Sequence, residues 1–361
     1  MKIESVVPYP LQIETGENLR GGSFTYSHFQ TVLVKAVCDG VEGWGEAMTR
    51  SEPEATALLV KQMAKPLVGR EFRTPGEAWE HSWRELRVRG HTRGVDVEAL
   101  SGIEITLHDC LGQLRRRPLN HLFSSSPAER VPVFAGSFFA SRGSLEGQVE
   151  EAKRWGLAGA KVKIGFGVGE DRDTLAKVRK LWPEGILVAD ANGAYDADGA
   201  AKACTAFADL GLAWFEEPVL SDDLEGYASL RGLGTRVGAG ESWYVGDFDR
   251  PIKEKLVDVV EPSVSRCGGL GVEMDVARRG AEVGIGFSPM TGMNSAISLA
   301  ASLHAASACP TIVAEYNPFP NPLQKELASG IGRPSAGSME VPSGPGLGIS
   351  IDERFVKAHT R

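Results

Sequence analysis

The chain has 361 residues, of which 42% are hydrophobic and 24% are charged, a composition typical of a globular protein with room for a barrel and a smaller domain. Its formal net charge of −8 argues against nucleic acid or an anionic membrane as the partner and favours a small-molecule ligand. The five cysteines show no C-x-x-C spacing, no run reaches the roughly 18 apolar residues of a membrane span, and the first residues lack a secretion leader, so we expect a cytoplasmic protein.

The first region, residues 1–126, has the pattern of an α+β domain. Residues 31–38 and 41–46 flank the turn Asp39-Gly40 and are typical of a β-hairpin. Three later stretches have the periodicity of amphipathic helices, and these cover residues 54–68, 75–87 and 95–116.

A polar break at Ser124–Pro127 separates this region from a series of short apolar runs with amphipathic segments between them. Eight such runs follow, which predicts an α/β barrel over residues 127–330. The runs begin at Val131 and continue near residues 160–164, 186–190, 213–217, 236–240, 256–260, 285–288 and 311–315. The tail, residues 331–361, is rich in Gly, Pro and Ser and has little core of its own, so we expect it to pack back on the first domain.

Three acidic residues close successive apolar runs at an even spacing. Asp190, Glu216 and Glu241 are separated by about 25 residues, which is roughly one strand-plus-helix unit of a barrel. Because the carboxyl ends of parallel barrel strands meet on one face, these side chains should converge. An all-oxygen ligand set without histidine or cysteine favours Mg²⁺, which normally keeps open positions for substrate oxygens.

One unit earlier, the segment Lys161-Val162-Lys163 places two ammonium groups on the same side of a strand. A protonated lysine is no base, but a second lysine and a nearby metal cation both lower its pKa. Lys163 is therefore a candidate to remove a proton next to a substrate carboxylate, since a divalent cation stabilises the enolate that forms.

The ordered motifs Lys-Val-Lys, Asp190-Ala-Asn192, Phe-Glu-Glu-Pro, Gly-Glu-Ser and Pro262-Ser-Val-Ser-Arg-Cys-Gly-Gly269 resemble the enolase superfamily, and in particular its mandelate racemase / muconate lactonizing enzyme branch. The resemblance implies a capping domain over a modified (β/α)7β TIM barrel. It also implies Mg²⁺ binding by Asp190, Glu216 and Glu241, proton abstraction by Lys163 with help from Lys161, and a hydrogen bond from Glu315 to the substrate carboxylate.

Two positions depart from the pattern that the resemblance implies. Racemases of this branch carry an aspartate and a histidine on the face opposite the lysines, and epimerases carry a lysine, whereas this chain has Ser263 and Met290. Because racemisation needs a proton donor on both faces and syn elimination needs one, we expect dehydration of an acid sugar. A racemase, epimerase or cycloisomerase stays open as an alternative, as does a non-catalytic carboxylate sensor.

Other residues have less specific signals. Asn192 is expected either to cap a turn or to contact the substrate, and Met290 and His28, the latter in a cap loop at residues 20–28, are expected to line the substrate site. His304 is expected to be a packed helix residue, and the glycine-rich segment 165–169 fails the G-x-G-x-x-G spacing of a nucleotide site. We further expect a homo-oligomer that binds a small carboxylate substrate, no nucleic acid and no membrane.

Overall fold

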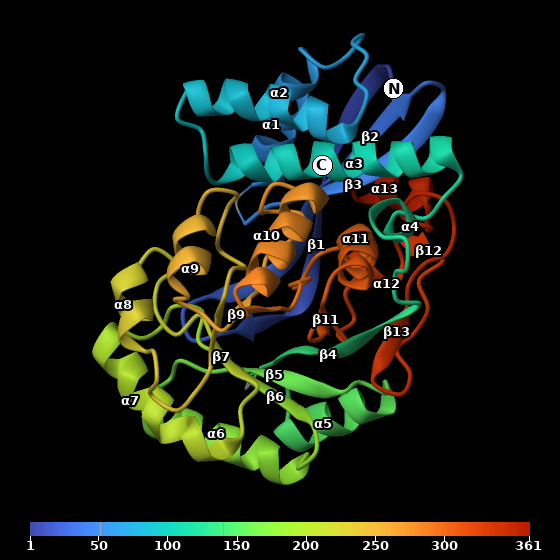
Figure 1. The fold of residues 1–361 in the computed structure, drawn as a ribbon. Coiled ribbons are helices and arrows are strands. Elements are labelled where there is room, and N and C mark those ends of the chain that lie inside the picture. Colours follow the sequence, from blue (N-terminus) through green and yellow to red (C-terminus); the bar gives the residue numbers. More distant parts are fainter. Residues whose placement is uncertain (51, 140) are drawn as a thin grey trace.

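The structure is a computed structural model that describes residues 1–50, 52–139 and 141–361. A small α+β cap lies over one end of a larger α/β barrel (Figure 1). This arrangement confirms the fold class expected from the sequence.

The cap is a three-stranded antiparallel sheet covered by helices. The expected hairpin joins its second and third strands, and Asp39 and Gly40 both have positive φ, as a tight two-residue turn requires. The first helix ends at Ala64, earlier than expected, because Pro66 has no backbone N–H to continue the ladder. The elements are β1 (Ile3–Arg20), β2 (Thr25–Cys38), β3 (Val41–Met48), α1 (Pro53–Ala64), α2 (Pro75–Val88), α3 (Val95–Arg115) and the short α4 (Asn120–Phe123).

Within the described residues, eight parallel strands form the barrel, in the spatial order β10-β9-β8-β7-β6-β5-β4-β11. Backbone hydrogen bonds from Ile312 N to Phe287 O and from Glu315 N to Pro289 O join the two ends of this row. The strands are β4 (Arg130–Phe138), β5 (Gly159–Lys163), β6 (Ile186–Asp190), β7 (Trp214–Glu216), β8 (Val237–Ala239), β9 (Val259–Val260), β10 (Gly286–Phe287) and β11 (Ala314–Tyr316).

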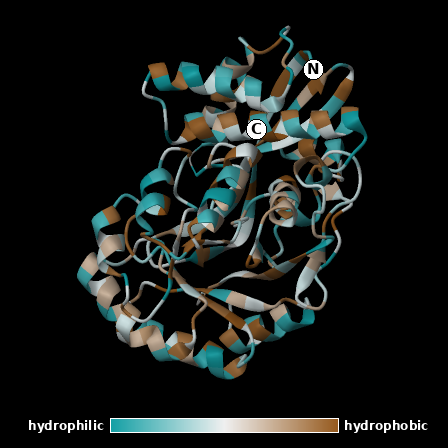
Figure 2. Cartoon of the chain, in the orientation of Figure 1, coloured by the Kyte–Doolittle hydropathy of each residue, from teal (hydrophilic) through white to brown (hydrophobic). Residues whose placement is uncertain are grey.

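One α-helix connects each strand to the next, which gives the (β/α)7β order. Hydrophilic and hydrophobic stretches alternate along the outer helices (Figure 2), and none of the described helices is both long and apolar enough to cross a membrane. Capping side chains such as Ser144 and Asp196 start several of them. The helices are α5 (Leu145–Arg154), α6 (Val168–Leu181), α7 (Ala197–Phe207), α8 (Leu224–Ser229), α9 (Asp249–Glu254), α10 (Leu270–Glu282) and α11 (Ala296–Ala308).

The segment that follows the barrel contacts both domains. Its strand β13 pairs with β4 of the barrel, while Glu353 forms an ion pair with Lys35 of the cap and Arg361 N donates a hydrogen bond to Pro10 O. Its elements are α12 (Pro322–Lys325), β12 (Ala328–Ser329), β13 (Ser338–Glu340), β14 (Ser350–Ile351) and α13 (Glu353–His359).

A buried carboxylate fixes the cap to the barrel. Glu46 of β3 accepts hydrogen bonds from the backbone N–H groups of Ser295 and Ser298 at 2.9 and 3.0 Å, and from the hydroxyls of Ser295 and Thr31 at 2.6 and 2.8 Å. These N–H groups belong to the start of α11, where a negative charge also stabilises the helix dipole. The cap strands β1 and β2 then extend down to the barrel mouth (Figure 1).

Candidate active site

The carboxyl ends of three neighbouring barrel strands form a row of charged side chains. Lys163 at the end of β5 pairs in register with Asp190 at the end of β6, and Asp190 pairs with Glu216 at the end of β7. Glu241 follows β8 by two residues, after Gly240, whose φ is +144° and whose position leaves no room for a side chain against the backbone of Glu261. The predicted lysines and acids therefore lie together at the mouth of the barrel.

The two lysines lie among the acids. Lys161 Nζ is 2.9 Å from Glu216 Oε1 and 3.5 Å from Asp190 Oδ2. Lys163 Nζ donates hydrogen bonds to Asp190 Oδ2 and, at 2.7 Å, to Asn192 Oδ1. Both side chains are at most 6% exposed, so their charges depend on these partners.

Two of the predicted metal ligands keep one carboxylate oxygen without a partner. Glu216 uses Oε1 for Lys161, and Glu241 uses Oε1 for Arg50 and Asn192 at 3.1 and 2.9 Å. The Oε2 atoms of both acids are buried without a hydrogen-bond partner among the described residues. Because an unpartnered buried carboxylate oxygen is costly, these atoms suit a bound cation.

No three His, Cys, Asp or Glu side chains in the described part of the chain already stand in the arrangement of a formed metal site. The ammonium group of Lys161 lies within 3.5 Å of carboxylate oxygens of Asp190, Glu216 and Glu315. The oxygen-only donor set and the two unpartnered Oε2 atoms still fit a hard divalent cation such as Mg²⁺.

The crowding of like charges shifts the titration of these groups. Burial raises the pKa of Glu216 far above its usual value, and the nearby Asp190 and Glu261 add to this. Burial alone would also raise the pKa of Glu241, but Arg50 and Lys163 lower it to about 2. The carboxylate of Glu241 therefore stays charged while that of Glu216 lacks a full counter-charge.

The net pKa shift of Lys163 is opposite to the shift expected from the sequence. Burial lowers the pKa, and the neighbouring Lys161 lowers it as expected, but the carboxylates of Asp190, Glu241 and Glu216 together raise it by more. The lower pKa expected for Lys163 includes the charge of a bound metal cation, and without that cation the surrounding acids favour the protonated amine.

Glu315 of β11 closes the ring of charged groups from the other side of Lys161. Its Oε2 accepts hydrogen bonds from the backbone N–H groups of Thr291 and Gly292 at 3.1 and 2.8 Å, and its Oε1 is 3.4 Å from Lys161 Nζ. A side chain on Gly136 would overlap Glu315 Oε1, so this glycine makes room for it. Glu315 borders an inner cavity of about 60 Å³ that Lys163 and Glu241 also line.

Met290 and Ser263 are the residues that this chain has where the resemblance calls for a second base. The sulfur of Met290 lies 3.7 Å from Lys161 Nζ and borders the inner cavity. Ser263 is buried beyond β9, with a hydroxyl that has no partner among the described residues. Neither side chain is a base at neutral pH, so the two amines described at this site, Lys161 and Lys163, both come from β5.

Asn192 and Glu217 follow the row with left-handed backbones, at φ values of 46° and 38°. Such strain in non-glycine residues is often concentrated at functional sites. Asn192 bridges Lys163 and Glu241 with its amide group, so it orders the site in addition to making a turn. Burial, followed by the charge of Glu241, raises the pKa of Glu217 to about 7, and its carboxylate accepts hydrogen bonds from Ser242.

The cap covers the mouth with the tip of its first hairpin. Ser23 Oγ donates a hydrogen bond to Asn192 O at 2.9 Å, and the ring of Phe24 lies 5.4 Å from Lys163 Nζ. His28 borders both the inner cavity and an outer one of about 390 Å³ beneath the hairpin. His28 and Met290 both line the inner cavity, which is compatible with the contributions to a substrate site expected from the sequence.

Sequence reasoning missed two residues at the site. Glu261 lies just beyond β9, accepts a hydrogen bond from Trp214 Nε1 at 2.9 Å and adds negative charge beside Glu216. The same signal that identified the three acids applies to it, because it closes the next apolar run about one unit after Glu241. Arg50 of the cap has no such signal, since only the tertiary fold brings it to Glu241.

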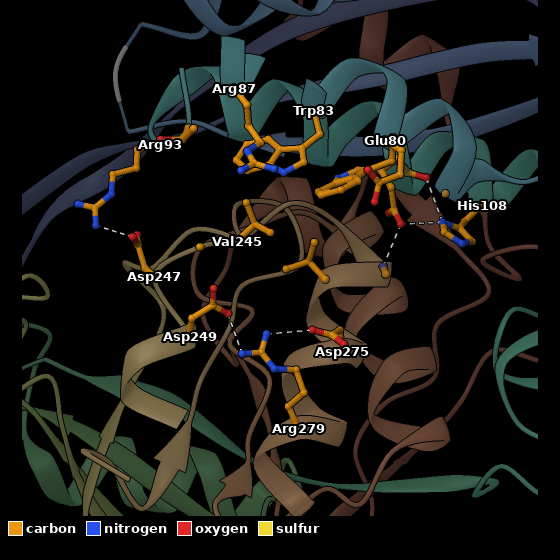
Figure 3. Close-up of a pocket in the computed structure, with 17 residues that line it drawn as sticks. Glu80, Trp83, Arg87, Arg93, His108, Val245, Asp247, Asp249, Asp275 and Arg279 are labelled. Carbon is orange, nitrogen blue, oxygen red and sulfur yellow. Dashed lines mark hydrogen bonds and ion pairs between the residues drawn. The ribbon is translucent and has the colours of Figure 1, made fainter. Parts of the chain in front are cut away.

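Two other features are separate from this chemistry. A cavity of about 800 Å³ lies between the cap helix α2 and the barrel helix α10, and its arginines are largely paired, Arg279 with Asp249 at 2.7 Å and Arg93 with Asp247 (Figure 3). In the glycine-rich segment 165–169, the N–H groups of residues 165 and 166 donate hydrogen bonds to the carboxylate of Asp171 at 2.8 and 3.2 Å.

Comparisons with known proteins agree with this architecture. The family "Mandelate racemase / muconate lactonizing enzyme, N-terminal domain" matches residues 19–124, and the family "Enolase C-terminal domain-like" matches residues 144–355. A racemase from Streptomyces coelicolor A3(2), solved with bound magnesium, has a TM-score of 0.91 at 25% identity and covers 99% of this chain and 100% of its own.

Relatives of known activity catalyse more than one reaction. D-galactarolactone cycloisomerase of Agrobacterium fabrum is 30% identical over 98% of this chain and 97% of its own length. Arabinonate dehydratase of Saccharolobus solfataricus is 27% identical over 87% of this chain and 86% of its own. On the family matches and this full-length similarity, the chain belongs to the mandelate racemase / muconate lactonizing enzyme family of the enolase superfamily.

Proposed function

We propose that the protein is a Mg²⁺-dependent lyase that removes the proton α to the carboxylate of an acid sugar and eliminates water. The observation that carries this proposal is the asymmetry of the site. Lys163 borders the inner cavity and Lys161 precedes it by two residues on the same strand, whereas Met290, which also borders the cavity, and the buried Ser263 stand where the resemblance calls for a second base. A site with a base on one side suits elimination better than inversion of a stereocentre.

The metal would be held by Asp190, Glu216 and Glu241, which supply the oxygen ligands that Mg²⁺ prefers. When bound, Mg²⁺ would supply positive charge that offsets the crowded carboxylates and stabilises an enolate electrostatically. Support comes from the unpartnered Oε2 atoms of Glu216 and Glu241 and from the magnesium in the related Streptomyces structure.

Lys163 would act as the base and then as the acid. Its neutral amine takes the α-proton, and the electrons of the broken C–H bond form the enolate. The ammonium group then returns the proton to the departing β-hydroxyl as the C–O bond breaks, so that water leaves and the enol product becomes a 2-keto acid. Lys161, held by Glu216 and Glu315, keeps a positive charge beside the substrate carboxylate.

A cycloisomerase is the second candidate, and the similarity to D-galactarolactone cycloisomerase over nearly the whole chain favours it. The same removal of an α-proton would expel a ring oxygen in place of a hydroxyl, so that no water leaves and the product is an isomer of the substrate. Lys163 would have the same role in both reactions, and the leaving group distinguishes them.

A screen of monoacid sugars, diacid sugars and their lactones with Mg²⁺ tests the proposal. We expect a 2-keto product from at least one acid sugar, with loss of one water by mass spectrometry. An isomeric product of unchanged mass would assign the cycloisomerase. If no acid sugar reacts and an N-acyl amino acid or a dipeptide racemises, the lyase proposal is wrong. If nothing reacts but an acid sugar binds, the protein is a sensor.

A further inference from the structure

Arg50 is the cap residue that reaches the row of acids. It lies two residues beyond β3, and its Nη2 donates a hydrogen bond to Glu241 Oε1 at 3.1 Å. Its side chain is 35% exposed, so it faces the cleft and is not enclosed like the two lysines. The guanidinium group of arginine carries five N–H donors in a planar fork. Among the described residues, the acceptor of a hydrogen bond from Arg50 is Glu241. Most of the fork is thus available to a ligand.

Arg50 also lies between the two cavities of the site. It lines the inner cavity of about 60 Å³ together with Lys163 and the outer cavity of about 390 Å³ together with Ser242. The inner cavity is far smaller than the roughly 300–1,000 Å³ of an ordinary ligand site. A substrate whose α-carbon lies at Lys163 must therefore extend past Arg50 into the outer cavity.

The charges around Arg50 favour an anion at that point. Lys161 has three carboxylates within 3.5 Å, and Lys163 has Asp190. The ion-pair partner of Arg50 is Glu241 at 3.1 Å, with the carboxyl group of Glu217 also nearby, and the second oxygen of Glu241 belongs to the proposed metal cage. When Glu241 shares its negative charge with a cation, the guanidinium loses part of its counter-charge and can bind a further anion.

We infer that Arg50 binds the second carboxylate of the substrate, so that the protein acts on dicarboxylic acid sugars in preference to monocarboxylic ones of the same length. This inference rests on the proposed function and names its substrate class. A guanidinium matches a carboxylate with two parallel hydrogen bonds, which a terminal hydroxymethyl group cannot accept. Tyr26 and Gln30, which border both cavities, add hydroxyl and amide groups suited to the sugar hydroxyls.

The test compares matched pairs that differ only at the far end, galactarate with galactonate and glucarate with gluconate. We expect the wild-type kcat/KM to favour the diacid of the reactive pair by about 100-fold, in the range of a charged hydrogen bond. Arg50→Gln should reduce the ratio of the two kcat/KM values to below about 3-fold, because the loss of the guanidinium lowers kcat/KM for the diacid much more than for the monoacid. Arg93→Gln, which breaks another ion pair between cap and barrel, is the matched control and should change neither.

Two kinetic outcomes would overturn the inference. If Arg50 only holds Glu241 in place, Arg50→Gln will lower kcat/KM equally for diacid and monoacid. If the wild-type protein prefers the monoacid, Arg50 does not select a second carboxylate.

A binding measurement separates this inference from the proposed function. Adipate and 6-hydroxyhexanoate have the same number of carbons, and neither carries a β-hydroxyl that could be eliminated. By titration calorimetry of the Mg²⁺-loaded protein, adipate should bind to wild type at least about 10-fold more tightly than 6-hydroxyhexanoate does. The two acids should bind to Arg50→Gln with equal affinity. If no acid sugar reacts, the lyase proposal fails while this difference still supports Arg50. Equal binding of both acids to wild type overturns it.

Discussion

Glu46 and His304 at the seam between cap and barrel are buried like Glu216 and Glu241 at the barrel mouth, but their hydrogen-bonding atoms are satisfied differently. At the seam, Glu46 accepts four hydrogen bonds, and His304 accepts one from Asn120 N at 3.2 Å and is 3.1 Å from Leu347 O. At the mouth, Glu216 and Glu241 each keep an unpartnered buried oxygen. The hydrogen bonds of Glu46 and His304 stabilise the fold, whereas Glu216 and Glu241 each leave one carboxylate oxygen available to a ligand.

Replacing the base should break the function of the mouth most strongly. Lys163→Ala should lower kcat/KM for the acid-sugar substrate by about 1,000-fold, or about 4 kcal/mol in transition-state stabilisation, because Lys161, the other amine of the site, is held by Glu216 and Glu315. Steady-state kinetics with the substrate found in the screen would measure this. Lys177→Ala, at an ion pair with Glu146 on the outer helices, is the control and should retain full activity. Equal activity of Lys163→Ala and wild type would exclude Lys163 as the base.

The buried His304 at the seam should make the stability of the protein depend on pH. Burial lowers the pKa of His304 to about 4, so the folded protein binds this proton at lower pH than the unfolded chain does. Stability should fall as the pH drops from about 6.5 to about 4, by about 3 kcal/mol from this group, and His304 should contribute no further change below that. Urea unfolding at several pH values measures this loss.

A glutamine at position 304 offers the same two hydrogen-bonding groups without a titrating ring. His304→Gln should therefore flatten the pH dependence between about 6.5 and about 4. The exposed His91 provides the control, because His91→Gln should leave the slope unchanged. If His304→Gln has the same slope as wild type, the histidine is not the buried neutral group that the structure describes.

Adding Mg²⁺ should stabilise the protein through the acids of the barrel mouth and not through the seam. At about 100 times its dissociation constant, Mg²⁺ should raise the free energy of unfolding by about 2.7 kcal/mol. Glu216→Gln removes a ligand charge and should abolish most of this gain, while Glu42→Gln, on the exposed side of β3, should retain it. A metal-dependent gain that is the same in Glu216→Gln would place the cation elsewhere.

The smallest expected effect is a change at the cap. Glu46→Gln puts an amide where the N–H groups at the start of α11 need acceptors, and should cost about 2 kcal/mol in the free energy of unfolding. In contrast to Lys163→Ala, which should lose activity, Glu46→Gln should lose stability and keep its catalytic activity at temperatures where the variant stays folded. Chemical denaturation and kinetics on the same preparation would show both. A loss of activity without any loss of stability would contradict this division.

The sequence predicted the barrel and its row of charges because both follow from local repetition. Asp190 and Glu216 end apolar runs one strand-plus-helix unit apart, and parallel strands place such residues side by side. Glu261 carries the same signal, because it directly follows the apolar run at residues 256–260. Only Val259 and Val260 of that run form a strand. The roles of these acids as metal ligands stay a prediction.

The contribution of the cap could not be predicted in the same way. Arg50 meets Glu241 across 191 residues of sequence, and Glu46 meets the start of α11 across about 250. Neither pair has a periodic signal, because each depends on how two domains dock. The direction of the pKa shift of Lys163 is hard to predict for a related reason, since it depends on the distances to all the surrounding acids.

The central claim is that one amine, on one side of the substrate, carries out the chemistry. Turnover of the acid-sugar substrate in D₂O with Mg²⁺, followed by NMR, tests it most directly. The account predicts a 2-keto product with solvent deuterium at C3, and recovered substrate with its original configuration at C2. Accumulation of the C2 epimer would contradict it, because inversion requires a second proton donor opposite Lys163.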